Sequence, residues 1–157
     1  VVAADLREPA SPWPEGVVPA TGDIRDRSFV EALGAIHDGA PVYGGRFGQT
    51  PKPGGFPRNE HPVVRTHPVT GRKALYVNRN FTTRIVGLRK NESDALLEML
   101  WRHSETPEFQ CRFAWRPNSI AFWDNRSAMH HAMWDYFPNR RLGHRVTVKG
   151  DRPFFRA

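Results

Sequence analysis

Cysteine is nearly absent from this chain of 157 residues, which contains Cys111 alone. A single thiol cannot form a disulfide within the chain, and it cannot build a metal site from several thiolates. Cys111 lies in the sequence FQCRFAW, where Phe109, Phe113 and Trp115 share its alternating register. This period of two predicts a strand in which Cys111 is a small buried side chain and not a nucleophile.

Long apolar runs are also missing from the sequence. No stretch has the pattern of a secretory signal or the length of a membrane helix, so we expect a soluble cytoplasmic protein with no membrane partner. The formal charge of +7 suggests a nucleic-acid partner, but the 23 Lys and Arg residues are scattered. Because there is no basic run, zinc-finger spacing or RNA-binding signature, we expect no nucleic-acid partner. Small anionic ligands explain the basic excess as well.

Prolines and glycines divide the chain into unlike parts. Residues 1–27 carry four prolines and little apolar material, so we predict an irregular segment there. Residues 28–157 form the second part. Within it, the many glycines and prolines of residues 38–60 predict a flexible loop.

Two segments have the pattern of helices. Residues 28–37 place apolar side chains on one face behind Ser28, a residue type that caps helices well. A second helix begins at Asn91 or Ser93 and runs to Arg102. Its apolar stripe consists of Leu96, Leu97, Leu100 and Trp101.

Short stretches with the apolar pattern of strands occupy much of the remaining sequence. They cover residues 63–65, 74–77, 109–115, 119–123 and 141–148. Short strands joined by turns, with a few helices, predict a mainly β chain of the α+β class. The arrangement expected for such strands is a jelly-roll-like sandwich, or part of one.

The residues with the most distinctive chemistry lie close to the C-terminus. His130 is followed eleven residues later by Arg141, and Arg145 comes four residues after that. A neutral imidazole can ligate a divalent metal, and each guanidinium can clamp an oxyanion through parallel hydrogen bonds. On one strand face the two arginines would lie ~13 Å apart, which suits two separate anionic groups better than one. The alternative is a solvated strand face with no ligand, whose other side, including Leu142, is buried.

Ordered blocks of sequence give this pattern a context. They read HPVVRTHP at 61–68, FTTRIV at 81–86, PEFQ at 107–110, WRPNSIAFWDNR at 115–126 and GDRPF at 150–154. Through these blocks, the chain from about residue 28 to its end resembles the taurine dioxygenase family of iron(II)- and 2-oxoglutarate-dependent oxygenases. The resemblance implies that family's double-stranded β-helix, which is a jelly-roll fold.

The resemblance also implies roles for particular residues. His130 matches the distal histidine of an Fe(II) site that has two histidines and one carboxylate. Arg141 matches the arginine that pairs with the far carboxylate of 2-oxoglutarate, the cosubstrate. Arg145 matches the arginine that binds the sulfonate in taurine-specific members, and Phe81 matches an aromatic residue of the substrate pocket. Trp123 would pack near the metal, whereas without the resemblance the residue types of Phe81 and Trp123 favour ordinary core positions.

One part of the family's pattern is missing from this sequence. The other two metal ligands form a His-x-Asp or His-x-Glu pair far upstream of the distal histidine. The only such pair here is His103 with Glu105, after the second predicted helix, where the family has no ligands. We interpret this pair as a decoy, so the chain resembles the C-terminal half of a dioxygenase without its N-terminal half. The strand edges thereby exposed favour a homo-oligomer.

Two functions therefore stay open. The first is an Fe(II)- and 2-oxoglutarate-dependent dioxygenase, or a C-terminal fragment of one, which hydroxylates a small anionic compound such as taurine, another sulfonate or a sulfate ester. The second is a non-catalytic truncated remnant, with at most anion binding or self-association. Whether the chain is itself an enzyme depends on ligands that its sequence does not contain.

Overall fold

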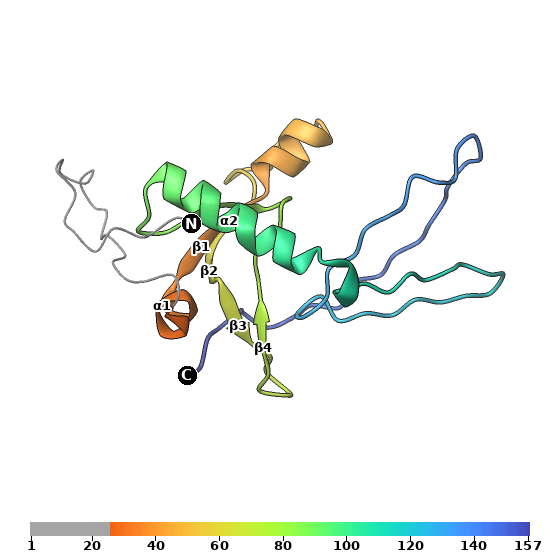
Figure 1. The fold of residues 1–157 in the computed structure, drawn as a ribbon. Helices are drawn as coiled ribbons and strands as arrows, with labels where there is room; N and C mark the ends of the chain where they lie inside the picture. The colour runs from red at the N-terminus through yellow and green to blue at the C-terminus, as the bar shows by residue number, and fades with distance from the viewer. Residues whose placement is uncertain (1–25) are drawn as a thin grey trace.

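The computed structural model describes residues 26–157 (Figure 1). Its elements in chain order are α1 (Arg27–Ala32), β1 (Gly34–Asp38), η1 (Ala40–Arg46), β2 (Arg58–Pro62), β3 (Val64–Thr66), β4 (Lys73–Leu75), β5 (Thr82–Ile85), α2 (Lys90–Ser104) and η2 (Pro107–Phe109). The irregular segment predicted for residues 1–27 lies outside the described residues, except for Asp26 and Arg27. None of the helices between residues 26 and 157 is long and apolar enough to cross a membrane.

The helix predicted over residues 28–37 is only partly present, because its second half is a strand. α1 ends at Ala32, and Asp26 caps it by accepting a hydrogen bond from the backbone N–H of Ser28 at 2.9 Å. Gly34, a poor residue for a helix interior, then begins β1. The cause of the difference is tertiary, since β1 finds a partner on each side, β2 and β5.

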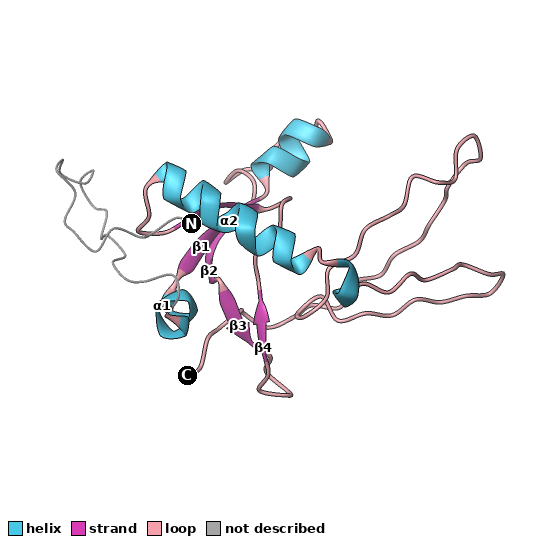
Figure 2. Cartoon of the chain, viewed as in Figure 1, coloured by secondary structure: helices cyan, strands magenta, loops and turns pink. Residues whose placement is uncertain are grey.

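Residues 26–109 contain all the helices and strands of the described chain, and we call them the packed part. Two small antiparallel sheets, drawn in magenta in Figure 2, form its centre. The first has the order β2-β1-β5, and Ile36 lies opposite Glu60 in one ladder and Arg84 in the other. The second pairs β3 with β4 and places Arg65 opposite Ala74. The strands predicted near residues 63–65 and 74–77 are therefore confirmed, with boundaries that differ by one or two residues.

The second predicted helix is confirmed as α2, which passes across the strands in Figure 1, although Arg89 and not Asn91 or Ser93 is its N-cap. Leu97 and Leu100 are buried in one cluster with Ile85 of β5. The buried Ser93 hydroxyl accepts a hydrogen bond from the backbone N–H of Ile85 at 2.8 Å, which fixes the start of the helix against the strand. The apolar stripe of α2 is therefore buried, as its spacing predicts, and it packs against the sheet that contains β5.

The stretch at residues 38–60 contains more regular structure than the predicted loop. β1 extends to Asp38, a π-helical turn covers Ala40–Arg46, and β2 begins at Arg58. The residues between these elements have no helix or strand and are mostly exposed. The flexibility of this stretch stays a prediction.

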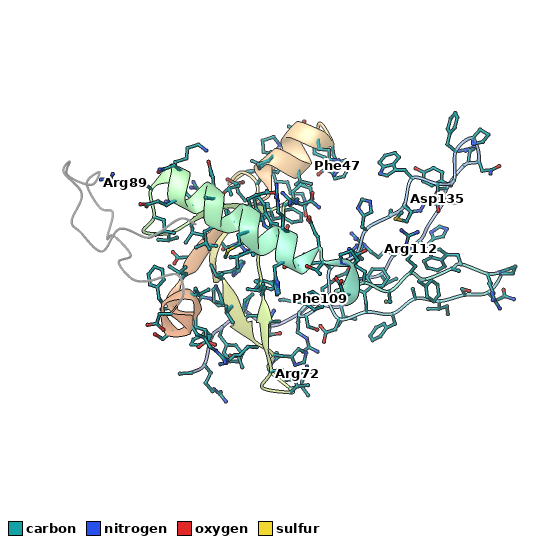
Figure 3. The ribbon with its side chains drawn as sticks, in the orientation of Figure 1. Phe47, Arg72, Arg89, Phe109, Arg112 and Asp135 are labelled. Carbon is teal, nitrogen blue, oxygen red and sulfur yellow. The ribbon has the colours of Figure 1, made fainter. Side chains whose placement is uncertain are left out.

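Beyond η2 the chain leaves the packed part as an irregular segment, residues 110–150, which we call the limb. Its teal and blue stretches run far from the sheets and return in Figure 1, and the side chains near the labelled Arg112 and Asp135 stand well away from α2 in Figure 3. The limb contains no helix or strand. The strands predicted at 109–115, 119–123 and 141–148 are therefore not formed.

The limb exposes side chains that strands would have buried. Ile120, Phe122 and Val146 have exposed fractions of 89%, 93% and 94%. Cys111, predicted to be buried, is also exposed. The physical reason is that backbone groups of a strand need a neighbouring strand, and the described residues offer the limb none.

After the limb, the C-terminal tail returns to β3. The backbone N–H of Thr66 donates to the Phe154 carbonyl at 2.7 Å, and the N–H of Arg156 donates to the Thr66 hydroxyl at 2.9 Å. Phe155 packs against the core, with Lys73 Nζ 4.1 Å from the centre of its ring. Both ends of the limb are thus attached to the packed part, η2 at one end and the tail at the other.

Candidate functional site

His130 lies exposed on the limb, next to Trp123. The two rings have centroids 4.7 Å apart and planes inclined by 47°. Trp123 Nε1 donates a hydrogen bond to Asn125 Oδ1 at 2.8 Å, within the turn that separates the two rings. The expected nearness of Trp123 and His130 is therefore present, whereas the expected strand before His130 is not.

Arg141 and Arg145 are exposed on the returning stretch of the limb. Within residues 26–157 neither guanidinium has an ion pair, so both are free to meet an anion. The strand predicted to give them a common face is not formed. Their assignment to two different anions stays a prediction.

Phe81 belongs to the packed part instead of the limb. Its ring lies 5.7 Å from that of Tyr43 in η1, and its carbonyl accepts a hydrogen bond from the Asp38 backbone N–H at 2.8 Å. Among the described residues, no ring contact, hydrogen bond or ion pair joins Phe81 to His130. In the described residues, these two candidate side chains therefore make no contact with each other.

The donor set for a metal ion is incomplete. Among residues 26–157, no three His, Cys, Asp or Glu side chains lie close enough together to hold a metal. The sequence of residues 1–25 contains no histidine. The described residues do not fit an iron site of two histidines and one carboxylate, because none of them places a second histidine and a carboxylate in a cluster with His130.

The pair interpreted as a decoy has other contacts in the structure. The exposed His103 ring meets Phe109 with 5.2 Å between centroids. Glu105 accepts a hydrogen bond from Arg79 Nε at 2.8 Å, and Arg79 Nη1 also donates to Glu98 at 2.7 Å. The hydrogen bond from Arg79 is the main reason that the pKa of Glu98 falls to about 2. Glu105 thus belongs to a surface ion-pair network at the end of α2.

Two contacts that the sequence does not reveal join the β3 region to Asp124 in the limb and to Asp151 just after it. Arg65 is buried in β3, and its Nη2 donates to Asp151 Oδ2 at 2.8 Å. His67 is buried just after β3, and its Nε2 lies 3.0 Å from Asp124 Oδ2. Hydrogen bonds from Arg126 first, and from His67 second, hold the pKa of Asp124 well below its usual range. The available signal was an arginine inside a short buried strand and a histidine directly after it, because buried side chains of these types need partners.

A pair of histidines lies on the neighbouring strands β1 and β2. The rings of His37 and His61 meet edge to face with centroids 5.0 Å apart, and Tyr76 stacks on His37 at 5.5 Å. Burial, and next the repulsion from His61, lowers the pKa of His37 to about 4. Burial also lowers the pKa of His61. Two imidazoles without a third donor nearby do not make a metal site.

Known proteins give this arrangement its context. Residues 23–147 match the family model described as taurine catabolism dioxygenase TauD, TfdA family. The chain is 43% identical over 95 residues to an alpha-ketoglutarate-dependent sulfonate dioxygenase of Saccharomyces cerevisiae. The matched stretch covers 59% of this chain and 23% of that protein. It is also 34% identical over 136 residues to an alkylsulfatase of Acinetobacter baylyi. This match covers 80% of the chain and 42% of that protein.

A solved structure agrees with these matches. A taurine dioxygenase from Burkholderia xenovorans superposes with a TM-score of 0.53 at 44% identity, over 64% of this chain and 31% of that one. The chain belongs to the taurine dioxygenase family. It spans between 23% and 42% of the length of the curated relatives it matches. His130, Arg141 and Arg145 all fall within the residues that the family model matches.

Proposed function

We propose that this chain supplies the distal histidine and both anion-binding arginines of an Fe(II)- and 2-oxoglutarate-dependent dioxygenase. The observation that carries the proposal is the family match over residues 23–147, which includes His130, Arg141 and Arg145. Exposure of all three side chains on the limb supports it, because each is accessible to a ligand or to a covering segment.

The missing ligands and strands would come from a further length of polypeptide, either continuous with this chain or separate from it. That length would carry the His-x-Asp or His-x-Glu pair and would complete the double-stranded β-helix. The limb supports this proposal through its residues 141–148. Leu142, Val146 and Val148 are 88%, 94% and 81% exposed, and all occupy even positions. Pairing this stretch as a strand would bury them and leave Arg141 and Arg145 together on the other face.

The substrates follow from the charge of the two arginines. Arg141 would bind the far carboxylate of 2-oxoglutarate, and Arg145 would bind the anionic group of a prime substrate such as a sulfonate or a sulfate ester. Two relatives, described as a sulfonate dioxygenase and an alkylsulfatase, support a sulfur oxyanion as the anionic group. A planar guanidinium suits such groups because it donates two parallel hydrogen bonds. Phe81 would line the pocket for the apolar part of the substrate once the domain is complete.

A non-catalytic remnant is the second candidate function. The observation that favours it is the donor set, in which residues 26–157 hold no cluster of metal ligands. In that case Arg141 and Arg145 would bind anions weakly, and the exposed limb would mediate self-association. The two candidates differ in whether a His-x-Asp or His-x-Glu pair is ever joined to this chain.

The deciding experiment starts at the DNA upstream of the codon for Val1. A reading frame that continues into a His-x-Asp or His-x-Glu pair favours the dioxygenase. The longer product should then form succinate from 2-oxoglutarate in the presence of Fe(II), oxygen and a sulfonate or alkyl sulfate, and His130→Ala should abolish this. Upstream sequence with no such pair, or a longer product without turnover on any member of this panel, favours the remnant.

The 157-residue chain alone provides an independent check. With one of three protein ligands, it should bind Fe(II) far more weakly than a complete site, and anaerobic calorimetric titration measures this. Tight one-to-one binding would contradict the proposed site. It would then direct attention back to His103 and Glu105.

A further inference from the structure

We infer that His67 and Arg65 are positioning residues, which hold the two ends of the segment from Asp124 to Asp151 that carries His130, Arg141 and Arg145. The inference relies on the proposed function only for what that segment binds. Its evidence is a pair of contacts between the β3 region and two aspartates of the C-terminal part, Asp124 and Asp151.

The first contact anchors the end of the segment. The Arg65 side chain is only 2% exposed, and its Nη2 donates to Asp151 Oδ2 at 2.8 Å. Its guanidinium carbon lies 4.9 Å from the centre of the Tyr76 ring. A buried guanidinium requires a partner, since an unpaired buried charge is strongly destabilising. Among the described residues its ion-pair partner is Asp151, which lies 86 positions along the chain.

The second contact anchors the start of the segment, and its geometry fixes the tautomer of His67. The backbone N–H groups of Val69 and Thr70 donate to His67 Nδ1 at 3.3 and 3.2 Å. Nδ1 is therefore an acceptor without a proton, so Nε2 carries the ring proton in the neutral ring. That Nε2–H donates to Asp124 Oδ2 at 3.0 Å. The turn after β3 thus orients one imidazole to bind one carboxylate of the C-terminal part.

The position of Asp124 affects His130 through the turn that follows Asp124 and through the neighbouring Trp123. Its backbone carbonyl accepts hydrogen bonds from Ser127 and Ala128, at 3.1 and 2.9 Å, and so closes the turn that leads toward His130. On its other side is Trp123, whose ring packs on the ring of His130. A shift of Asp124 would therefore move both the turn and the aromatic surface against which His130 rests.

The rest of the segment makes these two contacts important. Residues 125–150 have no helix or strand, so no ladder of backbone hydrogen bonds fixes the path of the chain. The exposed pairs on α2, such as Lys90 with Asp94, connect residues of one helix and leave the limb untouched. Among residues 26–157, the segment is therefore placed by contacts between the packed part and the residues on either side of it, such as those of Arg65 and His67.

Two substitutions at His67 separate its two roles. In His67→Asn the side-chain oxygen can replace Nδ1 as the acceptor for the Val69 and Thr70 amides. The asparagine side chain is too short, however, to donate the hydrogen bond that His67 Nε2 makes to Asp124. In His67→Gln the longer amide can still donate to Asp124. The readout is the ring-current shift that Trp123 imposes on the His130 ring protons, measured by NMR on the 157-residue chain. We expect His67→Asn to abolish this shift and His67→Gln to retain it.

Controls distinguish positioning from loss of folding. The amide resonances of α2 should be unchanged in both variants, and Asp94→Asn, which breaks an exposed pair on α2, should leave the His130 shift intact. If His67→Asn fails to fold, Asp124→Leu tests the same contact from its partly exposed side and should also abolish the shift. An unchanged shift in the folded His67→Asn or Asp124→Leu chain overturns the inference, as does an equal loss in His67→Gln.

The Arg65 contact has its own test at the other end of the segment. In Asp151→Leu the amide of Thr66, which donates to the Phe154 carbonyl, should exchange with solvent about tenfold faster, and Asp151→Asn should recover part of the protection because it keeps an acceptor. Equal protection of Thr66 in all three chains would remove Arg65 from the inference. Neither readout depends on turnover, so a failure of the proposed function would leave both results interpretable.

Discussion

The packed part and the limb contain similar kinds of sequence, but only the packed part forms strands and a core. Both hold short stretches in which apolar side chains alternate, yet in residues 26–157 the buried apolar side chains all lie between Leu33 and Leu100. β1 forms because β2 and β5 flank it, whereas the limb's residues 141–148 have no neighbour and form no strand. The difference shows that alternation specifies a face for burial, while a partner strand decides whether the strand exists.

The largest effect should come from a core substitution that has no counterpart in the limb. Leu97→Ala removes a side chain that is 1% exposed, and it should lower the free energy of unfolding by about 2–5 kcal/mol. Leu142→Ala makes the same chemical change at a residue that is 88% exposed and should change it by less than about 0.5 kcal/mol. Urea unfolding of both variants measures this. A comparable loss from Leu142→Ala would mean that the limb is packed in solution.

The limb should become important when the domain is complete. In a complete, active form, Arg141→Ala should weaken 2-oxoglutarate by ~3 kcal/mol, because a buried carboxylate loses its partner. Arg145→Ala should instead weaken the anionic prime substrate and leave the affinity for the keto acid nearly intact. Lysine at either position should recover only part of the loss, since it keeps the charge without the planar two-point clamp.

Both Michaelis constants, measured for each arginine variant, test this separation. Equal damage to both substrates from both alanine variants would show that the arginines hold the strand in place. The assignments to two anions would then be wrong.

A smaller effect should appear as the pH falls from 6.5 to about 4, and its largest source should be a histidine of the packed part. Burial and the neighbouring His61 lower the pKa of His37 from 6.5 to about 4. Above pH 6.5 the ring is neutral in both the folded and the unfolded chain. Between pH 6.5 and about 4 the unfolded chain binds a proton that the folded chain does not, so the free energy of unfolding should fall as the pH falls. The loss should be about 1–2 kcal/mol, because the partly exposed ring keeps some solvation.

Unfolding of the wild type and two glutamine variants across this pH range tests the effect. His37→Gln should reduce the pH dependence and leave the part that comes from His61, whose pKa burial also lowers. His131→Gln, at an exposed limb position, should leave it unchanged. A stability that rises toward pH 4 in the wild type would contradict the sign of the effect.

The smallest change in stability should come from a substitution that places a charge on the limb. The same substitution should nevertheless reduce self-association of the chain measurably. Phe122 is 93% exposed, and Phe122→Lys should alter the free energy of unfolding by less than about 0.5 kcal/mol. The same change should reduce self-association of the 157-residue chain, because exposed apolar stretches and free strand edges favour pairing between copies. Sedimentation velocity over a range of concentrations measures this, with Arg112→Lys as a charge-preserving limb control. Association unaffected by Phe122→Lys would remove this stretch from the interface.

Local patterns predicted the elements that depend on few partners. The stripe of Leu96, Leu97 and Leu100 located α2 because its backbone hydrogen bonds close within the helix itself. The start of β1 was missed because the helical spacing of residues 28–37 is genuine, but two strands compete for Ile36 and His37. The contact of His67 with Asp124 spans 57 positions, and no short-range rule connects residues so far apart.

By itself, the sequence determined the family and located the segment with His130, Arg141 and Arg145 that carries the family's pattern, because each depends only on residue types and spacing. Tertiary structure decided which alternating stretches became strands, and it placed Arg65 and His67 against the two aspartates that bracket this segment. The physical reason is that a helix satisfies its backbone from within, whereas a strand, a buried charge or a metal site needs groups from elsewhere in the fold.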